Sequence, residues 1–451
     1  MTLSPASPSV AAGRPGPILY EVNSMALRTG TGIATYARHL VQAAARLGYE
    51  CDGLIGVERG LAGRDRRLNE ILAFDAAREG LEPLWEAVLR HARYPFGALG
   101  GMRLAEIPQS GLVVGPMTDA FKVFRRLFAA THLVDAARVH FTIYGQLARL
   151  RVENRPSLFH ATQPVPLAVK GAANIYTIHD LVPLRLPYAS LVSKKYFYRM
   201  LMKLARTADH IVTVSEHSKR DIVEFLGIDD RRVTNTYQSV EIPAGLLARS
   251  DHDVADDLAT LFGLEYGGYF LFYGAIEPKK NVSRMVDAYA ASGSKLPLVI
   301  AGGGGWQNRG DLRKMRDERF VNFQIDGDIV RRQRKVRRLD YLPRDHLIAL
   351  IRGARAVLFP SIYEGFGLPV IEAMILGTPV VTSNVSSLPE IAGDAALLVD
   401  PYSIEDITRA IQAVEADADL RDALAERGRG QARKFSTDAY DERLRQLYEK
   451  F

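Results

Sequence analysis

Short apolar runs alternate with amphipathic segments along most of this chain. The runs Ile18–Asn23 and Asp52–Val57 flank a segment from about Ile33 to Leu47 whose apolar positions have helical spacing and which stops at Gly48. Each run ends in polar residues, as buried strands of parallel sheets do. Three more strands are expected at Ser157–His160, Asn174–His179 and His210–Val214.

A second series of strands and helices begins near Tyr269. Strands that alternate with helices predict a parallel sheet that is covered on both faces. The two series therefore predict an α/β protein with two Rossmann-like domains that face a central cleft. The strands expected in the second series are Phe270–Tyr273, Leu298–Ala301, Ala356–Phe359, Pro379–Thr382 and Ala396–Val399.

The polar, acidic stretch Ile242–Glu265 is expected to hold the domain boundary. Between residues 60 and 150 the pattern of Ala, Leu and Arg suggests helices and places no strand. The first residues are rich in Ser, Pro, Ala and Gly and lack the apolar core of a secretory signal, so we expect a disordered tail. The expected divisions are a tail at 1–17, an N-terminal domain at 18–262, a C-terminal domain at 263–430, and at 431–451 a helix that could return to the N-terminal domain.

Composition narrows the classes of function. The chain is 47% hydrophobic and 24% charged, as in ordinary globular proteins, and no apolar stretch reaches the roughly 18 residues of a membrane span. The single cysteine, Cys51, excludes an intrachain disulfide and a cysteine-based metal cluster and favours a cytoplasmic location. The net charge of +6 favours anionic partners such as nucleotide phosphates, acidic lipids or nucleic acid.

Ligands of parallel α/β sheets bind beyond the carboxyl ends of the strands. The most informative motif, Ser361–Met374, follows one such strand end, at Phe359. Pro369 favours a helix start, and a helix is expected through Glu372 to Leu376, ending at Gly377. The other loops in which we look for chemistry follow Asn23, His179, Tyr273 and Ala301.

The residues of this motif suit a sugar diphosphate. Gly365 and Gly367 let the backbone approach a ligand closely, and the free N–H groups of a helix start attract phosphate. Glu364 in the loop and Glu372, expected in the first helical turn, can accept hydrogen bonds from sugar hydroxyls. The alternative is a tight turn followed by a glutamate that stabilises the helix dipole.

The motif resembles the signature of the retaining GT-B glycosyltransferases of family 4. Similarity covers about Tyr269 to Pro401 and continues through Gly377–Val381, Ser387–Glu390 and Gly393–Ala396. The resemblance implies a GT-B fold and a nucleotide-sugar donor. It further implies that Glu364 binds hydroxyls of the donor sugar, that Glu372 binds the ribose, and that sugar and phosphate are held by the amides of Gly365, Phe366, Gly367 and Leu368.

A second loop, Tyr273–Asn281, carries two adjacent lysines. Lys279 and Lys280 could neutralise a departing diphosphate, although an exposed basic pair is the simpler interpretation. The loop resembles the phosphate-binding loop of the family, with Lys280 at its lysine and Asn281 beside it on the donor. Many members have an arginine where this chain has Ala275, so either Lys279 supplies that charge or the phosphates are held differently.

Gly30-Thr31-Gly32 lies between the first strand and the first helix. It resembles G-x-G-x-x-G, but Thr35 replaces the third glycine and no acidic residue ends the second strand, as a dinucleotide site requires. The family resemblance implies instead that the amide of Gly32 approaches the donor phosphate. A left-handed turn before a helix is the alternative.

His179 ends an expected strand where the cleft should lie. It resembles the active-site histidine of the family, which implies that it lines the donor-sugar or acceptor site, and Asp180 could orient its ring. His160 ends another strand and is interpreted as structural. Ser215 is expected to cap a helix that begins at Glu216.

The run Arg331–Arg338 holds six basic residues in eight. It is interpreted as the solvated face of a helix or, alternatively, as a contact for anionic lipid headgroups or an anionic acceptor. Nucleic acid is disfavoured because aromatic residues are not interleaved with the charges.

The sequence predicts a retaining glycosyltransferase in which His179, Lys280 and Glu364 are catalytic and no metal or other cofactor is needed. The motifs resemble those of mannosyltransferases of surface polysaccharide assembly, which favours GDP-mannose and leaves UDP-glucose open. The expected acceptor is a saccharide or a lipid-linked saccharide, and the expected place is the cytoplasm or the inner membrane face. A GT-B nucleotide-sugar epimerase and a non-catalytic sugar-nucleotide-binding subunit remain alternatives.

Overall fold

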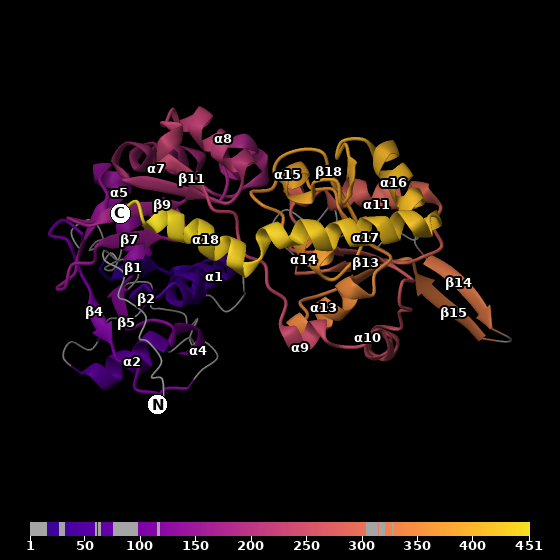
Figure 1. Cartoon of the computed structure of the whole chain (residues 1–451), viewed down its shortest axis with the longest axis horizontal. Helices are drawn as coiled ribbons and strands as arrows, with labels where there is room; N and C mark the ends of the chain where they lie inside the picture. Colours follow the sequence, from indigo (N-terminus) through magenta and orange to yellow (C-terminus); the bar gives the residue numbers. More distant parts are fainter. Residues whose placement is uncertain are drawn as a thin grey trace, which may run out of the picture.

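The computed structural model describes residues 16–26, 32–58, 61, 65–74, 98–114, 118–303, 314, 321–326 and 329–451. Two parallel-sheet domains lie beside one another along the long axis of the molecule (Figure 1). This confirms the predicted fold class. Among the described helices, none combines the length and the apolar character needed to cross a bilayer.

The first domain is built on an eight-stranded sheet in the order β11-β10-β9-β7-β1-β2-β5-β4. All neighbouring strands pair in parallel except β4, which is antiparallel to β5. The strands are β1 Ile18–Glu21, β2 Cys51–Val57, β4 Ala105–Ile107, β5 Arg126–Thr131, β7 Leu158–Ala161, β9 Ala173–Thr177, β10 His210–Thr213 and β11 Val233–Asn235. A small second sheet joins β3 Met102–Arg103, β6 Ala148–Arg151 and β8 Leu167–Val169.

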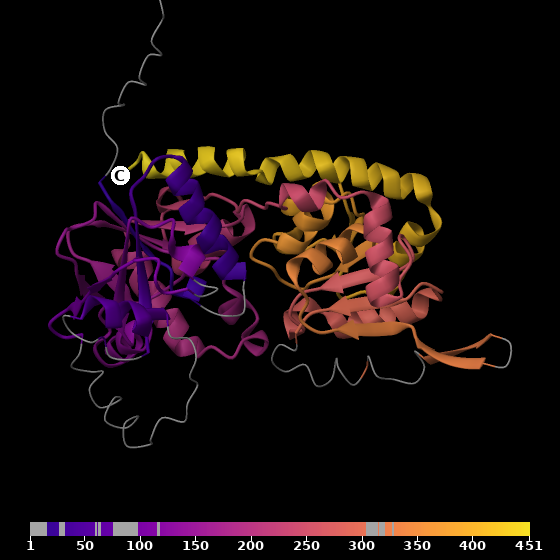
Figure 2. The same ribbon diagram turned by 90° about the horizontal axis from the view of Figure 1, so that it is seen from below.

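Helices cover both faces of this sheet (Figures 1 and 2). The apolar side of α1, which includes Leu40 and Val41, is fully buried, as its helical spacing predicts. The α-helices are α1 Gly32–Arg46, α2 Arg66–Phe74, α4 Thr118–Phe121, α5 Leu133–Tyr144, α6 Val182–Arg185, α7 Lys194–Thr207 and α8 Glu216–Leu226. Single 3-10 turns occupy Asn23–Ala26, Pro187–Ala189 and Asp230–Arg232.

In the described part of the region after residue 60, four strands begin before residue 150, where the sequence placed none. In β6 buried Ala148 and Leu150 alternate with exposed Arg149 and Arg151, so a strand of period two was mistaken for helical spacing. Strand β5 begins at Arg126, which pairs with buried Asp52 of β2 at 2.6 Å. A charged strand start of this kind hides the apolar run that follows it.

The second domain is built on a six-stranded parallel sheet in the order β16-β13-β12-β17-β18-β19. The strands are β12 Phe270–Tyr273, β13 Leu298–Ala301, β16 Val336–Leu339, β17 Ala356–Phe359, β18 Val380–Ser383 and β19 Leu397–Val399. The α-helices are α11 Val282–Ser292, α13 Arg344–Arg352, α14 Leu368–Ile375, α15 Leu388–Ala392, α16 Ile404–Ala416 and α17 Ala418–Ala432, and a 3-10 turn covers Pro278–Lys280.

The basic run Arg331–Arg338 forms strands, so its interpretation as a helix face was wrong. The first half of the run belongs to β15 Ile329–Arg334, which forms an antiparallel hairpin with β14 Val321–Asp326. The second half belongs to β16, the edge strand of the six-stranded sheet. Basic side chains are common on edge strands because they discourage pairing with other chains. The hairpin projects from the second domain (Figure 1).

Two helical segments link the domains. The stretch after the first sheet holds α9 Ala244–Leu247, α10 Asp251–Asp257 and a π-helical turn at Leu258–Phe262, and Arg352 of α13 forms an ion pair with Asp251 at 2.8 Å. At the carboxyl end, α17 passes through a 3-10 turn at Arg433–Phe435 into α18 Thr437–Tyr448, which lies against α1 of the first domain (Figures 1 and 2). An ion pair of 2.7 Å between Arg46 and Asp441 fixes this contact.

Candidate active site

Two helix starts meet at the carboxyl ends of the two sheets. A side-chain carbon added to Gly32, the first residue of α1, would lie 3.8 Å from Cδ1 of Leu368, the first residue of α14. Gly367 before it has φ 124°, in the left-handed region, and a side chain there would also reach Leu388 at 3.0 Å. The backbone N–H groups of both helix starts therefore lie near one point, although Gly30 and Thr31 fall outside the described residues.

A charged cluster lies beside these helix starts. Oε1 of Glu364 accepts a hydrogen bond of 2.6 Å from Nζ of Lys280, and Nζ of Lys279 lies 3.5 Å from Oε2. The Glu364 side chain is only 8% exposed. Burial alone would raise its pKa, but the two ammonium groups outweigh burial and hold the pKa below its usual value. The cluster thus contains an ionised carboxylate and one positive charge in excess.

Hydroxyl groups fix the backbone of the Glu364 loop. The N–H of Glu364 donates to Oγ of Ser386 at 2.9 Å, and Oγ of Ser386 donates in turn to the carbonyl of Glu364 at 2.6 Å. Oγ of Ser387 donates to the carbonyl of Phe366 at 2.6 Å. Ser386 has φ 63°, a strained value for a residue with a side chain. The sequence analysis did not name Ser386, and the nearest feature that could have indicated it is the family-like segment that begins at Ser387.

The sequence predicted Glu372 in the first helical turn, and this prediction was wrong. Helix α14 begins at Leu368, so Glu372 is its fifth residue and faces the site from the second turn. Its Oε2 lies 3.1 Å from the hydroxyl of Tyr273, which also lies 2.8 Å from the carbonyl of Pro369. Burial raises the pKa of Glu372, and the guanidinium of Arg344 partly opposes this. Sequence analysis had noted Tyr273 only as a strand end and had missed Arg344.

His179 approaches this cluster from the first domain. Its Nε2 lies 2.9 Å from the carbonyl oxygen of Thr162, so Nε2 carries the proton and Nδ1 is an acceptor. Burial lowers the pKa of His179, which keeps the ring neutral at pH 7. Asp180 does not orient the ring as expected, because its Oδ1 accepts from the N–H of Val182 at 3.0 Å and supports α6.

A buried hydrogen-bonded chain lies behind His179. The ring of Tyr36 meets the ring of His179 edge-on at 4.7 Å, and the hydroxyl of Tyr36 lies 3.0 Å from Oγ1 of Thr177. Thr177 bonds to Nε2 of His160 at 2.9 Å, and Nδ1 of His160 lies 2.7 Å from the hydroxyl of Tyr448 in α18. Burial lowers the pKa of His160 to about 3, in agreement with a structural role.

The Glu364 loop contacts the first domain directly. A side-chain carbon on Gly365 would lie 2.7 Å from the carbonyl oxygen of His179, so only glycine permits this approach. The hydroxyl of Ser218 donates to the carbonyl of Gly365 at 3.2 Å. Glu390 accepts from the N–H groups of Glu216 and His217 at 2.7 and 3.0 Å, at the start of α8 that Ser215 caps as predicted.

The side chain of Asn281 braces the lysine loop. Asn281 has φ 60°, and its Nδ2 donates to the carbonyl oxygens of Pro360 at 3.0 Å and Pro401 at 2.7 Å. Both amide hydrogens are therefore used within the protein. This geometry favours a positioning role for Asn281.

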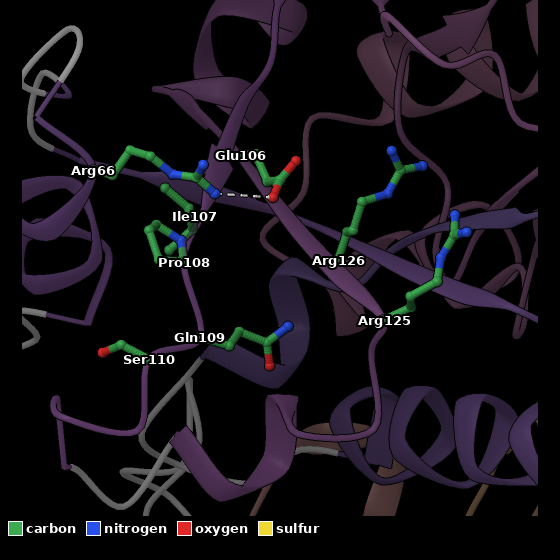
Figure 3. Close-up of a pocket in the computed structure, with 8 residues that line it drawn as sticks. All are labelled: Arg66, Glu106, Ile107, Pro108, Gln109, Ser110, Arg125 and Arg126. Atoms are coloured by element: carbon green, nitrogen blue, oxygen red, sulfur yellow. Dashed lines mark hydrogen bonds and ion pairs between the residues drawn. The ribbon is translucent and has the colours of Figure 1, made fainter.

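A separate, open pocket lies in the first domain (Figure 3). It encloses about 340 Å³ and is lined by residues that include Arg66, Glu106, Arg125 and Arg126. Arg125 and Arg126 both pair with Asp52, and Arg66 pairs with Glu106 at 3.3 Å. Because Arg126 is the first residue of β5, the cavity lies at the amino ends of the strands, opposite the edge where parallel sheets bind ligands.

No group of three or more His, Cys, Asp or Glu side chains in the described part of the chain is placed to hold a metal ion. Among the described residues, the groups at this cluster that could face a phosphate include the two lysines and the helix starts. Two facing parallel-sheet domains with such a site define the GT-B class of nucleotide-sugar proteins.

Two protein-family models match the chain. The model for glycosyl transferases group 1 covers residues 265–431, and the model for glycosyltransferase family 4 covers residues 116–241. The chain belongs to the family 4 (group 1) glycosyltransferases.

Several curated relatives are mannosyltransferases by name. The chain is 32% identical over 267 residues to O-antigen chain mannosyltransferase B of Escherichia coli, an alignment that covers 58% of this chain and 66% of the relative. It is 28% identical over 249 residues to an O-antigen chain mannosyltransferase of Salmonella typhimurium, covering 55% of this chain and 62% of the relative. The chain thus spans less than two thirds of the length of these relatives.

Solved structures share the fold over nearly the whole chain. Sucrose-phosphate synthase from Thermosynechococcus elongatus matches with a TM-score of 0.61 at 18% identity, covering 96% of this chain and 98% of that protein. The Anabaena protein HepE, in complex with UDP and glucose, matches with a TM-score of 0.62 at 15% identity, covering 97% and 100%. These matches confirm the GT-B fold.

Proposed function

We propose that the protein is a retaining glycosyltransferase that moves a hexose from a nucleoside diphosphate to a saccharide or a lipid-linked saccharide. The observation that supports this most is the Glu364 carboxylate between Lys279 and Lys280, where the starts of α1 and α14 meet. A sugar diphosphate needs both kinds of group, a carboxylate for its hydroxyls and positive charge for its phosphates.

Each side chain has a defined part in this proposal. Glu364 accepts hydrogen bonds from hydroxyls of the donor sugar, and Glu372 accepts them from the ribose. Lys280, Lys279 and the amides of Gly32 and residues 365–368 stabilise the negative charge that grows on the diphosphate as its bond to the sugar breaks. Lys279 supplies the positive charge that many members of the family carry on an arginine at the position of Ala275.

The reaction needs one bond formed and one broken. The acceptor hydroxyl oxygen bonds to the anomeric carbon on the face that the diphosphate leaves, and the departing phosphate oxygen takes the proton of that hydroxyl. Retention of configuration follows from this route, which the family resemblance implies. His179, neutral and held by Thr162, lines the pocket of the transferred sugar or its acceptor.

GDP-mannose is the proposed donor, and assembly of a surface polysaccharide is the proposed setting. The names of the relatives support both proposals, because several are O-antigen mannosyltransferases. UDP-glucose is the second choice. We propose a cytoplasmic enzyme that works at the inner membrane face.

The test is release of nucleoside diphosphate from a panel of sugar nucleotides, with and without glycolipid acceptors. A transferase releases GDP from GDP-mannose chiefly when an acceptor is present. Release without acceptor, together with a changed free sugar, would indicate an epimerase instead. Tight binding of the donor without turnover under every condition would indicate a binding subunit.

A further inference from the structure

The part of the chain between Asp180 and Asp209 is strongly one-sided in charge. It contains six basic residues and no acidic one, whereas the whole chain has an excess of only six. The six are Arg185, Lys194, Lys195, Arg199, Lys203 and Arg206. This stretch covers α6, a loop and α7, and it begins two residues after His179.

The run Arg331–Arg338 is partly tied into its own domain. Lys335 donates to the carbonyl of Ser294 at 3.1 Å, and Arg337 donates to the carbonyl of Gly263 at 3.1 Å. Arg338 pairs with Asp340 at 2.7 Å. These three side chains have partners, as do Arg185, Lys194 and Lys203 in the stretch between Asp180 and Asp209. Charge alone therefore does not separate the two stretches, and the exposed side chains beside the charges must decide between them.

Helix α7 presents a basic and aromatic side to solvent. Met200, Leu201 and Leu204 are buried, whereas Lys195, Tyr198, Arg199 and Arg206 are exposed at spacings of three, four and seven residues. The exposed positions thus form one stripe of the helix. The loop before the helix adds Leu191, 71% exposed, and Val192, 44% exposed.

Further apolar side chains lie beside this stripe. The ring of Phe225 in α8 meets the ring of Tyr198 at 6.5 Å, and both are exposed. Exposed Ile143 lies near the end of α5, where a carbon added to Gly145 would be 3.8 Å from the guanidinium of Arg199. Helices α5, α7 and α8 cover the same side of the first domain (Figure 1). We call the exposed stripe of α7 (Lys195, Tyr198, Arg199 and Arg206), together with Leu191, Val192 and Phe225, the α7 surface.

We propose that the α7 surface docks the protein onto an anionic phospholipid bilayer. Basic residues alone would bind any polyanion. Exposed Leu191 and Val192 add binding free energy only where an apolar phase lies beneath the negative charges, because there they can be buried away from water. A bilayer offers both. Each basic residue near an anionic membrane raises partitioning about fivefold, and this attraction weakens with salt.

The position of the α7 surface suits the proposed reaction. Helix α6 and the loop to α7 follow His179 directly, so docking by this loop holds the active-site edge of the first domain at the membrane. A lipid-linked acceptor would then reach His179 without leaving the bilayer. Only this last step rests on the proposed function, since vesicle binding needs neither donor nor acceptor.

The experiment is co-sedimentation of the full chain with vesicles of 30% phosphatidylglycerol in phosphatidylcholine, and with phosphatidylcholine alone, at low and high salt. One variant carries Lys195→Gln, Arg199→Gln and Arg206→Gln. A charge-matched control carries Arg331→Gln, Arg332→Gln and Arg334→Gln. We expect the first variant to lose about a hundredfold in partitioning to the anionic vesicles, three fivefold steps, and the control to lose less than fivefold.

A second variant, Leu191→Ser with Val192→Ser, tests the apolar part. It should weaken vesicle binding at high salt as well as at low salt, because its contribution is not electrostatic. The proposal is overturned if the α7 charge variant binds like wild type, or if the control loses as much. It is also overturned if the serine variant changes nothing while heparin competes fully, because the surface would then serve a polyanion. Absence of transfer by the wild-type protein to soluble and to glycolipid acceptors alike, from every sugar nucleotide tested, would refute the proposed function and leave the vesicle result standing.

Discussion

Replacement of Lys279 by methionine tests how the donor phosphates are held. Lys279 and Lys280 lie 3.5 and 2.6 Å from the two oxygens of Glu364, so the cluster carries two positive charges and one negative charge. Lys279→Met reduces that sum from one to zero. Glu364 keeps Lys280 as its partner, whereas Asp180 and Glu277, whose charges also act on Lys279, lose that interaction.

The magnitude follows from electrostatics. A unit charge about 4 Å from a phosphate oxygen is worth about 4 kcal/mol at an effective dielectric constant of 20. Removal of one group that stabilises transition-state charge typically costs about 3 kcal/mol, or roughly a hundredfold in kcat. The variant also removes one of the two charges that lower the pKa of Glu364, so the acid limb of the pH–rate profile should move to higher pH.

The assay is steady-state release of nucleoside diphosphate as a function of donor concentration and pH. Lys335→Met is the matched control, because Lys335 bonds only to a carbonyl at the edge of the second sheet and should leave kcat within twofold. A loss below fivefold in Lys279→Met, with an unmoved acid limb, would refute the argument. Lys279 would then be a bystander, and Ala275 would need another explanation.

Three further results are expected. Glu372→Gln should weaken bare nucleoside diphosphate as well as the sugar donor in calorimetric titrations, and unchanged affinity for the bare nucleotide would exclude the ribose role. Glu21 is fully buried, and burial raises its pKa to about 7, above the ordinary 4.5. This carboxyl destabilises the fold increasingly as the pH rises from 4.5 to 7, so Glu21→Gln should gain about 3 kcal/mol in urea unfolding at pH 8 and little at pH 4.5; equal gains at both pH values would contradict the assignment. A chelator should leave the rate unchanged, because lysines and helix starts oppose the phosphate charge, and a loss restored by Mg²⁺ would exclude that mechanism.

Much of the fold could be predicted from the sequence because buried parallel strands leave a local signal. Strand β12 and strand β17 were predicted with their observed limits, since each is a short apolar run that ends in polar residues. Strand β6 was missed because it has only four residues and lies in a stretch rich in Ala, Leu and Arg, residues that favour helices. The run at Arg331–Arg338 was taken for a helix because charge alone does not distinguish a solvated helix from an edge strand.

The site was predictable where chemistry and sequence proximity coincide. Glu364 and Glu372 are eight residues apart, in one loop and the helix that follows it. Lys279 and Lys280 are adjacent in a single turn. Their proximity is therefore visible in the sequence. The partners that hold the site residues do not lie close in the sequence: Thr162 orients His179 from a different strand end, and Ser386 holds Glu364 from 22 residues away. Such contacts depend on how the sheets bring strand ends together, which no local pattern reveals.

The central claim is that Glu364 holds the donor sugar for transfer. Glu364 is buried between two lysines, and both Ala and Gln remove its charge. Gln is the sharper substitution because it keeps the shape of the side chain and a carbonyl oxygen that can still accept a hydrogen bond from Lys280. The most direct measurement is transfer of radiolabelled mannose from GDP-mannose to glycolipid acceptors by wild type and by Glu364→Gln, with circular dichroism and thermal unfolding as checks of the fold. The account predicts transfer by wild type and a loss of at least a hundredfold in a folded Glu364→Gln protein. Transfer by Glu364→Gln at near the wild-type rate would contradict it.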